Sequence, residues 1–297
     1  MLSIHPFSML GILIKVSRSG LGVRSLSTNS RFPQATFSTF DQVAQSAHRR
    51  KPIVLKGLCV DLPAIRKWFT PSVIESGHHE LNATYLGTHG STVVPLELTR
   101  SSAGAAGLES RVSFERFEAP LSLLLSHMTS SDQSLSLYLA QCALNDLPTG
   151  LQADLPTPKL LSSLGHGRTD IYGSSLWMGR PPTKTPLHRD PNPNLFVQLA
   201  GRKVVRLMEP EDGRRLYERL RAGAGHAHMR GDEMMVGTEM ERLEDAVWGD
   251  GTEDFQDTSG VEATLGSGDA LLIPLGWWHA VRGVGKSPNA SVNWWFR

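Results

Sequence analysis

The stretch Asn194-Leu-Phe-Val-Gln-Leu-Ala-Gly-Arg-Lys-Val-Val-Arg-Leu-Met208 decides the fold class. Apolar residues dominate both of its halves, and Ala200-Gly201 separates the halves. Apolar runs of about four to eight residues bounded by turn residues predict strands, so two strands joined at Ala200-Gly201 are expected. A hairpin at this point would bring Lys203, in the second strand, alongside the first.

Other short strands are predicted around this stretch, each bounded by glycine, proline or asparagine. They are Ile171–Met178, Leu195–Ala200, Lys203–Met208, Val261–Leu265, Ala270–Pro274 and Ala290–Phe296. Many short strands with such separators predict an all-β sandwich or barrel. Residues 241–262 hold eight acidic residues and one arginine, which predicts a solvated acidic insert between two strands.

The N-terminal half has a different pattern. Apolar spacing predicts helices over Phe40–His48, Leu62–Phe69, Pro120–His127 and Leu135–Ala143, a strand over Lys51–Gly57 and a loop over Ser101–Gly107. One domain is therefore expected over residues 36–297, with a helix-rich part over 36–165 and a barrel core over 166–297.

Residues 1–35 differ in composition from the remainder of the chain. They are rich in arginine and serine, and no acidic residue precedes Asp41. That composition is typical of a mitochondrial transit peptide. The alternatives are a disordered tail or a mispredicted start codon, with the protein in the cytoplasm or nucleus.

The overall composition limits the function classes. Of the 297 residues, 40% are hydrophobic and 20% charged, which is enough to bury a sizeable core. The formal net charge of +1 disfavours nucleic acid as a bulk partner. No apolar run is long enough to cross a membrane. The two cysteines, Cys59 and Cys142, are predicted to be buried small hydrophobes.

A candidate metal site lies in Thr185-Pro-Leu-His-Arg-Asp-Pro-Asn-Pro-Asn194. Residues i and i+2 of an extended chain point to the same side, so His188 and Asp190 can enter one pocket. Downstream, Gly268-Asp-Ala-Leu-Leu-Ile-Pro-Leu-Gly-Trp-Trp-His279 predicts a strand and a turn that deliver His279. Two histidines and one carboxylate on one face of an octahedral ion are typical of non-haem Fe(II) oxygenases.

Each of these residues also has a simpler interpretation. Alone, His188 and Asp190 would be read as a surface turn among prolines, and His279 as a core histidine behind two tryptophans. Lys203 lies on a mostly apolar strand near the predicted pocket. There its ammonium could pair with a dicarboxylate ligand, at the carboxylate farther from the metal. Its simpler interpretation is an exposed lysine.

Several stretches together resemble the JmjC-domain family of Fe(II)- and 2-oxoglutarate-dependent oxygenases, in its small cupin-like hydroxylase branch. They are Lys51-Pro-Ile-Val-Leu-Lys-Gly57, Val94-Pro-Leu-Glu97, Tyr138-Leu-Ala-Gln141, Leu176-Trp-Met-Gly179, Thr185-x-x-His-x-Asp190, Asn194-x-Phe-x-Gln-x-x-Gly-x-Lys203, Gly268-Asp, Ile273-Pro, Trp277-Trp-His279 and Ser291-Val-Asn-Trp-Trp295. The resemblance implies a mainly β fold with α-helices: a double-stranded β-helix, or jelly-roll barrel, flanked by N-terminal helices.

Residue by residue, the resemblance implies roles for particular side chains. The iron ligands would be His188, Asp190 and His279. The 2-oxoglutarate contacts would be Lys203, Thr185, Asn194, Tyr138 and Asn293. For these last four, turn chemistry or a satisfied core polar group is the competing interpretation. The substrate pocket would contain Glu97 and Trp177, which suits a cationic side chain, although an exposed glutamate and a core tryptophan are the simpler interpretations.

The resemblance implies Fe(II), 2-oxoglutarate and O₂ as cofactor and cosubstrates, and hydroxylation of a C–H bond on an arginyl- or lysyl-type protein side chain as the reaction. A small-molecule substrate, lysine demethylation, tRNA-base hydroxylation and a non-catalytic binding protein stay open as alternatives. Cys142 stands where relatives often carry a histidine. The chain stops at Arg297, where relatives that dimerise through C-terminal helices continue, so that mode of dimerisation is in doubt and the oligomeric state stays open.

Overall fold

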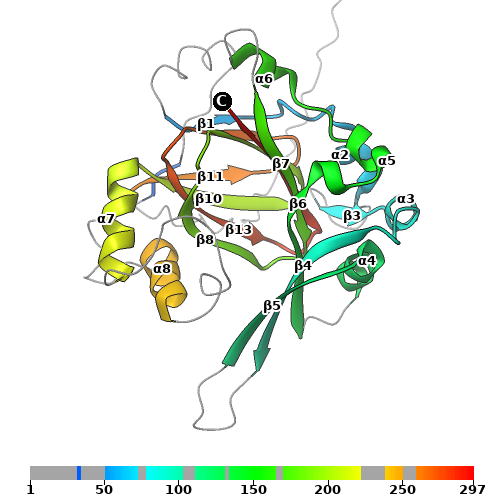
Figure 1. Ribbon diagram of the computed structural model, residues 1–297, viewed down its shortest axis with the longest axis horizontal. Coiled ribbons are helices and arrows are strands. Elements are labelled where there is room, and N and C mark those ends of the chain that lie inside the picture. Colours follow the sequence, from blue (N-terminus) through cyan, green and yellow to red (C-terminus); the bar gives the residue numbers. More distant parts are fainter. Residues whose placement is uncertain are drawn as a thin grey trace, which may run out of the picture.

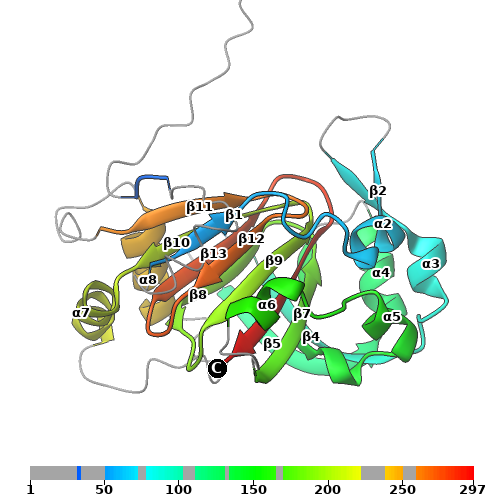
Figure 2. The same ribbon diagram turned by 90° about the horizontal axis from the view of Figure 1, so that it is seen from above.

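Two antiparallel sheets form the core of the computed structural model (Figures 1 and 2), which describes residues 32–34, 51–72, 78–102, 111–130, 134–164, 170–221, 238–249 and 259–297. The eight-stranded sheet has the order β1 (Ile53–Leu55), β12 (Ala270–Ile273), β9 (Asn194–Ala200), β14 (Asn289–Phe296), β7 (Ile171–Gly179), β6 (Leu135–Ala143), β4 (Val93–Ser102), β5 (Arg111–Pro120). The four-stranded sheet has the order β11 (Val261–Leu265), β10 (Arg202–Met208), β13 (Trp278–Val284), β8 (Thr183–Arg189).

The two sheets face each other across an apolar interior. One buried cluster joins Phe196, Leu271 and Ile273 of the larger sheet to Val205 and Val281 of the smaller one. Side chains alternate in and out along each strand, so both sheets contribute every second residue to this interior. The fold is the jelly-roll arrangement that the resemblance implied, mostly β with some helix.

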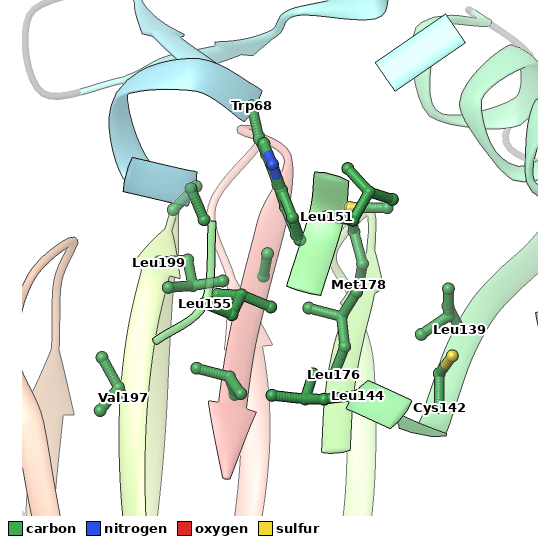
Figure 3. Packing of buried hydrophobic residues seen from close by; sticks show 14 of the residues in the cluster. Trp68, Leu139, Cys142, Leu144, Leu151, Leu155, Leu176, Met178, Val197 and Leu199 are labelled. Atoms are coloured by element: carbon green, nitrogen blue, oxygen red, sulfur yellow. The ribbon is translucent and has the colours of Figure 1, made fainter. Parts of the chain in front are cut away.

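Helices cover the outer face of the larger sheet. They are α2 (Pro63–Trp68), α3 (Ala83–Gly87), α4 (Leu121–Thr129), α5 (Thr149–Ala153) and α6 (Lys159–Leu164), together with the 3-10 turn η1 (Leu144–Asp146) and the small sheet β2 (Phe69–Pro71)–β3 (His79–Leu81). Figure 3 shows Trp68 reaching from α2 toward the sheet, where Leu151, Leu176 and Met178 lie close by. Burying an aromatic side chain of about 150–250 Å² contributes about 4–6 kcal/mol at about 25 cal/mol/Å².

Helices α7 (Pro210–Arg221) and α8 (Thr238–Trp248) lie together on the opposite flank, against the smaller sheet (Figures 1 and 2). The prediction of a solvated insert was wrong for the part within α8. Leu243, Ala246 and Val247 are buried against Trp278 because they share one helix face, and several of the acidic residues lie on the exposed side. Residues 250–258 of that prediction lie outside the described part.

The strand predictions for the C-terminal half are confirmed, and the chain also contains β8 and β13, which the pattern did not predict. The prediction of a hairpin at Ala200-Gly201 was wrong. β9 and β10 belong to different sheets, and Gly201 carries the chain between them. Its φ of +69° lies in the left-handed region, and a Cβ there would stand 2.5 Å from the backbone oxygen of Pro288. Only glycine makes this corner without strain.

The helix predicted over Leu135–Ala143 was also wrong, because these residues form β6. Leu137 and Leu139 face the helix layer, whereas Tyr138 and Ala140 face the barrel interior. A strand buried on both faces reads as a continuous apolar run, which periodicity cannot distinguish from a buried helix. Residues 36–165, which were predicted to be rich in helices, therefore also contain three long strands: β4, β5 and β6.

The helices predicted over Leu62–Phe69 and Pro120–His127 are confirmed as α2 and α4. Burial of Cys59 and Cys142 is confirmed as well. The transit peptide, the helix over Phe40–His48 and most of the loop over Ser101–Gly107 lie outside the described residues. Within the described part of the chain, none of the helices has the length and apolarity needed to cross a membrane.

Candidate metal centre

Two neighbouring strands of the smaller sheet deliver the three predicted ligands. His188 in β8 and His279 in β13 are direct partners in the antiparallel register, and their ring centroids lie 4.2 Å apart. Asp190 follows directly after β8. One ligand atom from each residue can be chosen so that the three lie within 4.8 Å of one another. The three side chains therefore converge as the sequence predicted, although His279 lies on β13, a strand after the Pro-Leu-Gly turn that was not predicted.

Backbone carbonyls fix the orientation of both imidazoles. The Nδ1 atom of His188 lies 2.8 Å from the carbonyl oxygen of Pro186, and that of His279 lies 3.4 Å from the oxygen of Trp277. Because a carbonyl only accepts, each Nδ1 carries the hydrogen and each Nε2 keeps its lone pair for a ligand. This is the outer-shell arrangement usual for metal-binding histidines.

The carboxylate of Asp190 completes the cluster. Its oxygens lie 3.9 Å from His188 Nε2 and 3.6 Å from His279 Nε2. Burial raises the pKa of Asp190, but the imidazoles of His279 and His188, the indole of Trp295 and the amide of Asn194 together hold it below its usual value. The Asn194 amide donates to Oδ2 of Asp190 at 2.8 Å and accepts from Asn293 at 2.9 Å, so a hydrogen-bonded chain orients the carboxylate.

The electrostatics of the cluster suit a divalent transition metal. Burial and the neighbouring His188 lower the pKa of His279, and Asp190 only partly opposes them. The imidazole of His279 is therefore neutral and available as a ligand near neutral pH. Two imidazoles and one carboxylate that line one cavity are the same donor set as the facial triad of non-haem Fe(II) sites.

Lys203 lies on β10 inside the barrel and is only 3% exposed. Its ammonium donates to Ser291 Oγ at 2.6 Å and Tyr138 Oη at 3.2 Å, and it stands 5.3 Å from the ring centroid of Phe196. Burial lowers its pKa to about 7. Its hydrogen-bond partners in the described structure are neutral. A buried cation with only hydroxyl partners is suited to receive an anion from solution.

A cavity of about 460 Å³ connects the triad to Lys203. Four more of the predicted residues line it: Thr185, Asn194, Asn293 and Trp177. Trp177 Nε1 and Asn293 Oδ1 are buried and have no hydrogen-bond partner within the described structure. Unsatisfied polar atoms on the lining of a cavity that also holds a buried lysine match the requirements of a polar ligand such as 2-oxoglutarate.

Tyr138 reaches the site through its contact with Lys203, whereas Glu97 lies outside the cavity lining. Glu97 pairs with Tyr138 across β4 and β6, and its carboxylate accepts from Arg116 Nε at 3.0 Å. Among the described residues that line the cavity, Asp190 is the only carboxylate. The role of Glu97 in binding a cationic side chain stays a prediction, but its carboxylate is already paired.

Sequence reasoning missed several residues of the site, among them Ser291 and Gln141. Ser291 lies two positions before Asn293 on β14, and strand alternation would have placed both on one face. Gln141 lines the cavity where β6 and β7 lose register, and its φ of +53° is left-handed. It is the only non-glycine residue with positive φ in the described part, and such strain often lies at functional sites.

Comparisons with known proteins agree with this geometry. The family model "Cupin-like domain" matches residues 39–297. "Lysine-specific demethylase 8" of Danio rerio is 28% identical over 249 residues, covering 83% of this chain and 53% of its own length. The Xenopus tropicalis protein of that name is 24% identical, with 83% and 48% covered.

"JmjC domain-containing protein D" of Dictyostelium discoideum is 26% identical, with 77% of this chain and 49% of its own length covered. The chain thus spans about half the length of the curated relatives that it matches. Because the family model matches nearly the whole described structure, the chain belongs to the cupin-like domain family, among relatives that carry the JmjC name.

Proposed function

We propose that the protein is an Fe(II)- and 2-oxoglutarate-dependent dioxygenase that hydroxylates a C–H bond of a protein side chain. The observation that carries the proposal is the presence of the His188–Asp190–His279 cluster and the buried Lys203 in one cavity. A metal ligand set alone would fit many proteins. A ligand set facing a buried lysine matches a dicarboxylate cosubstrate in particular.

In this proposal Nε2 of each histidine and one oxygen of Asp190 hold the iron. The carboxylate of 2-oxoglutarate farther from the metal is bound by Lys203, Ser291 and Tyr138. Asn293 and Thr185 line the same cavity. With both groups bound, the site supplies the oxidation of a C–H bond to C–OH, coupled to conversion of O₂ and 2-oxoglutarate into succinate and CO₂. The apolar interior around Phe196 and Val281 excludes water from the reacting centre.

Lysine demethylation uses the same chemistry on an N-methyl group, which then leaves as formaldehyde. The printed names of two relatives favour this second candidate. Mass spectrometry of candidate protein substrates separates the two reactions. Hydroxylation gives a product that retains one added oxygen atom, whereas demethylation removes one CH₂ unit and releases formaldehyde. Formation of neither product, with 2-oxoglutarate left unconsumed, would favour a non-catalytic binding protein.

We also propose that residues 1–35 direct the protein to mitochondria, on the strength of their basic, serine-rich composition. A fluorescent reporter fused behind these residues tests this directly. A diffuse cytosolic or nuclear signal would refute mitochondrial import and leave the proposed chemistry unaffected.

A further inference from the structure

A second hollow of about 650 Å³ adjoins the cavity of the metal centre. Tyr172, Ser175 and Trp295 line both hollows, so the two share a wall and meet at one rim. Tyr172 is 62% exposed and is the most exposed large hydrophobic residue in the described structure.

The second hollow lies along an open edge of β7. Strand β6 ends at Ala143, which pairs with Ser175, so in the described structure no strand pairs with Ile171–Ser174 on that side. After Ala143 the chain continues into η1, which still packs against β7, and then into α5; residues of both segments and of β7 line the hollow. At about 3.3 Å per residue, four edge residues span roughly 13 Å, enough for three or four residues of an added strand.

A bulge directs Tyr172 toward the metal centre. Gly173 pairs with Trp295 and Ile171 pairs with Phe296, which leaves Tyr172 as the extra residue between two registered pairs. A bulge changes the direction in which its side chain points, which explains how Tyr172 lines the same cavity as Ser175 three positions later. The open edge and the metal cavity are therefore linked by a local distortion of one strand.

The lining of the hollow identifies the chemistry of its occupant. None of the described residues that form it is charged. Asn145, Gln152, Thr157 and Ser174 offer neutral polar groups, and Trp294 and Trp295 offer apolar surface. A nucleic acid strand would require cations along its phosphates, and a highly charged metabolite would require counter-charges. A polypeptide backbone in extended form requires only neutral donors, acceptors and a flat floor.

We propose that this hollow is a substrate subsite in which an extended, neutral segment of a polypeptide lies along the free edge of β7, next to the residue that enters the metal cavity. The inference rests on the proposed oxygenase function. It adds a binding place for the part of the substrate chain that flanks the target residue. The target residue must then belong to a segment that is unfolded or locally extended, because a strand edge cannot pair with a helix.

Gly173 allows a direct test, because a Cβ built there meets only Trp295 Cε3, at an ordinary 3.8 Å, and its φ is not left-handed. The variants Gly173→Ala and Gly173→Val fill the hollow in two steps. Gly266→Val is the matched control: a Cβ there meets only Asp269 Oδ2, at 3.7 Å, and Gly266 lies in the turn before β12, outside both hollows.

The probe is a set of pools of capped decapeptides, each pool with one fixed central residue, incubated with the full chain, Fe(II), 2-oxoglutarate and O₂. Mass spectrometry counts peptides that gain one oxygen, and succinate is measured in parallel. The wild type should oxidise at least one pool but not the capped single amino acid of that pool. Peptide oxidation relative to succinate should fall several-fold in Gly173→Ala and at least tenfold in Gly173→Val, and Gly266→Val should match the wild type.

Two results would overturn the subsite. One is equal oxidation of the peptide and the capped amino acid, or of the wild type and both Gly173 variants. The other is succinate formation by the wild type with no oxidised peptide, which refutes a peptide occupant and leaves the oxygenase intact. If the wild type forms no succinate at all, the proposed function itself fails, and the subsite fails with it. Thermal unfolding of each variant shows whether Gly173→Val has folded; if it has not, Gly173→Ala decides.

Discussion

The ammonium of Lys203 donates to Ser291 Oγ at 2.6 Å in the interior of the barrel, where its described hydrogen-bond partners are neutral. Burial lowers the pKa of Lys203 to about 7, so this side chain is largely neutral in the free protein above that pH. A bound carboxylate would favour the charged form. Binding of 2-oxoglutarate at pH above 7 should therefore take up about one proton.

The first prediction concerns this proton. At saturating Mn(II) and between pH 7 and 9, affinity for 2-oxoglutarate should fall by up to about tenfold per pH unit as Lys203 loses its proton in the free protein. Anaerobic calorimetry in two buffers of different ionisation enthalpy measures both the affinity and the proton uptake. A flat profile with no proton uptake would mean that Lys203 is already charged, or does not contact the ligand.

The second prediction concerns Lys203→Met, which replaces a buried amine with an apolar chain of similar length. Below pH 7, where Lys203 is charged, the ligand-free variant should be more stable than the wild type by about 1–3 kcal/mol, because a buried charge without a charged partner is unfavourable. Affinity for 2-oxoglutarate should fall by about 10- to 100-fold. Urea unfolding with and without 2-oxoglutarate measures both effects. A variant that is stabilised by 2-oxoglutarate as much as the wild type would contradict the assignment.

A third prediction concerns Asn194, which links Asp190 to Asn293. Asn194→Ala removes the amide that orients the Asp190 carboxylate, and loss of such an outer-shell partner typically costs about 10- to 100-fold in metal affinity. Metal titration followed by tryptophan fluorescence can measure this loss. Asn82→Ala is a suitable control, because Asn82 caps α3 far from the site and should leave metal affinity unchanged. Equal metal affinity in Asn194→Ala and the wild type would remove Asn194 from the site.

Gln141 gives a fourth prediction. Its left-handed backbone costs of order 1 kcal/mol or more, and Gln141→Gly relieves this strain. Because the side chain is exposed, the variant should gain about 0.5–1 kcal/mol in unfolding free energy. It should also oxidise substrate less efficiently, since a contact at the cavity rim is lost. Chemical unfolding and product mass spectrometry provide the two readouts. A gain in stability with unchanged substrate oxidation would show that the strain has no role in catalysis.

The convergence of His188, Asp190 and His279 was predictable because each side of the cluster has a local signal. His188 and Asp190 share a strand side by alternation, and the turn before Trp277 fixes where the next strand begins. The prediction that Lys203 lies in the cavity of the metal cluster was correct, but the topology on which it relied was wrong. The interpretation relied on a paired hairpin, whereas the chain crosses between sheets at Gly201 and Lys203 reaches the cavity from the opposite wall.

The remaining features depend on contacts between distant segments. β6 is apolar on both faces because it lies between the helices and the barrel interior. The sequence of β6 alone does not show whether such an apolar run is a strand or a helix. Helix α8 was not predicted because its acidic residues suggested a solvated insert, although Leu243 and Val247 have the spacing of one helix face. The ion pair between Glu97 and Arg116 follows from the pairing of β4 with β5, which the sequence analysis did not predict.

In the proposed function, His188, Asp190 and His279 hold the iron with which this chain consumes 2-oxoglutarate. The most direct measurement is succinate formation by the purified full-length protein with Fe(II), compared among the wild type, Asp190→Ala and Glu80→Ala, a control on β3. We predict turnover that depends on Fe(II) in the wild type and in Glu80→Ala, and none above background in Asp190→Ala. Full turnover and full iron binding by Asp190→Ala would contradict the account.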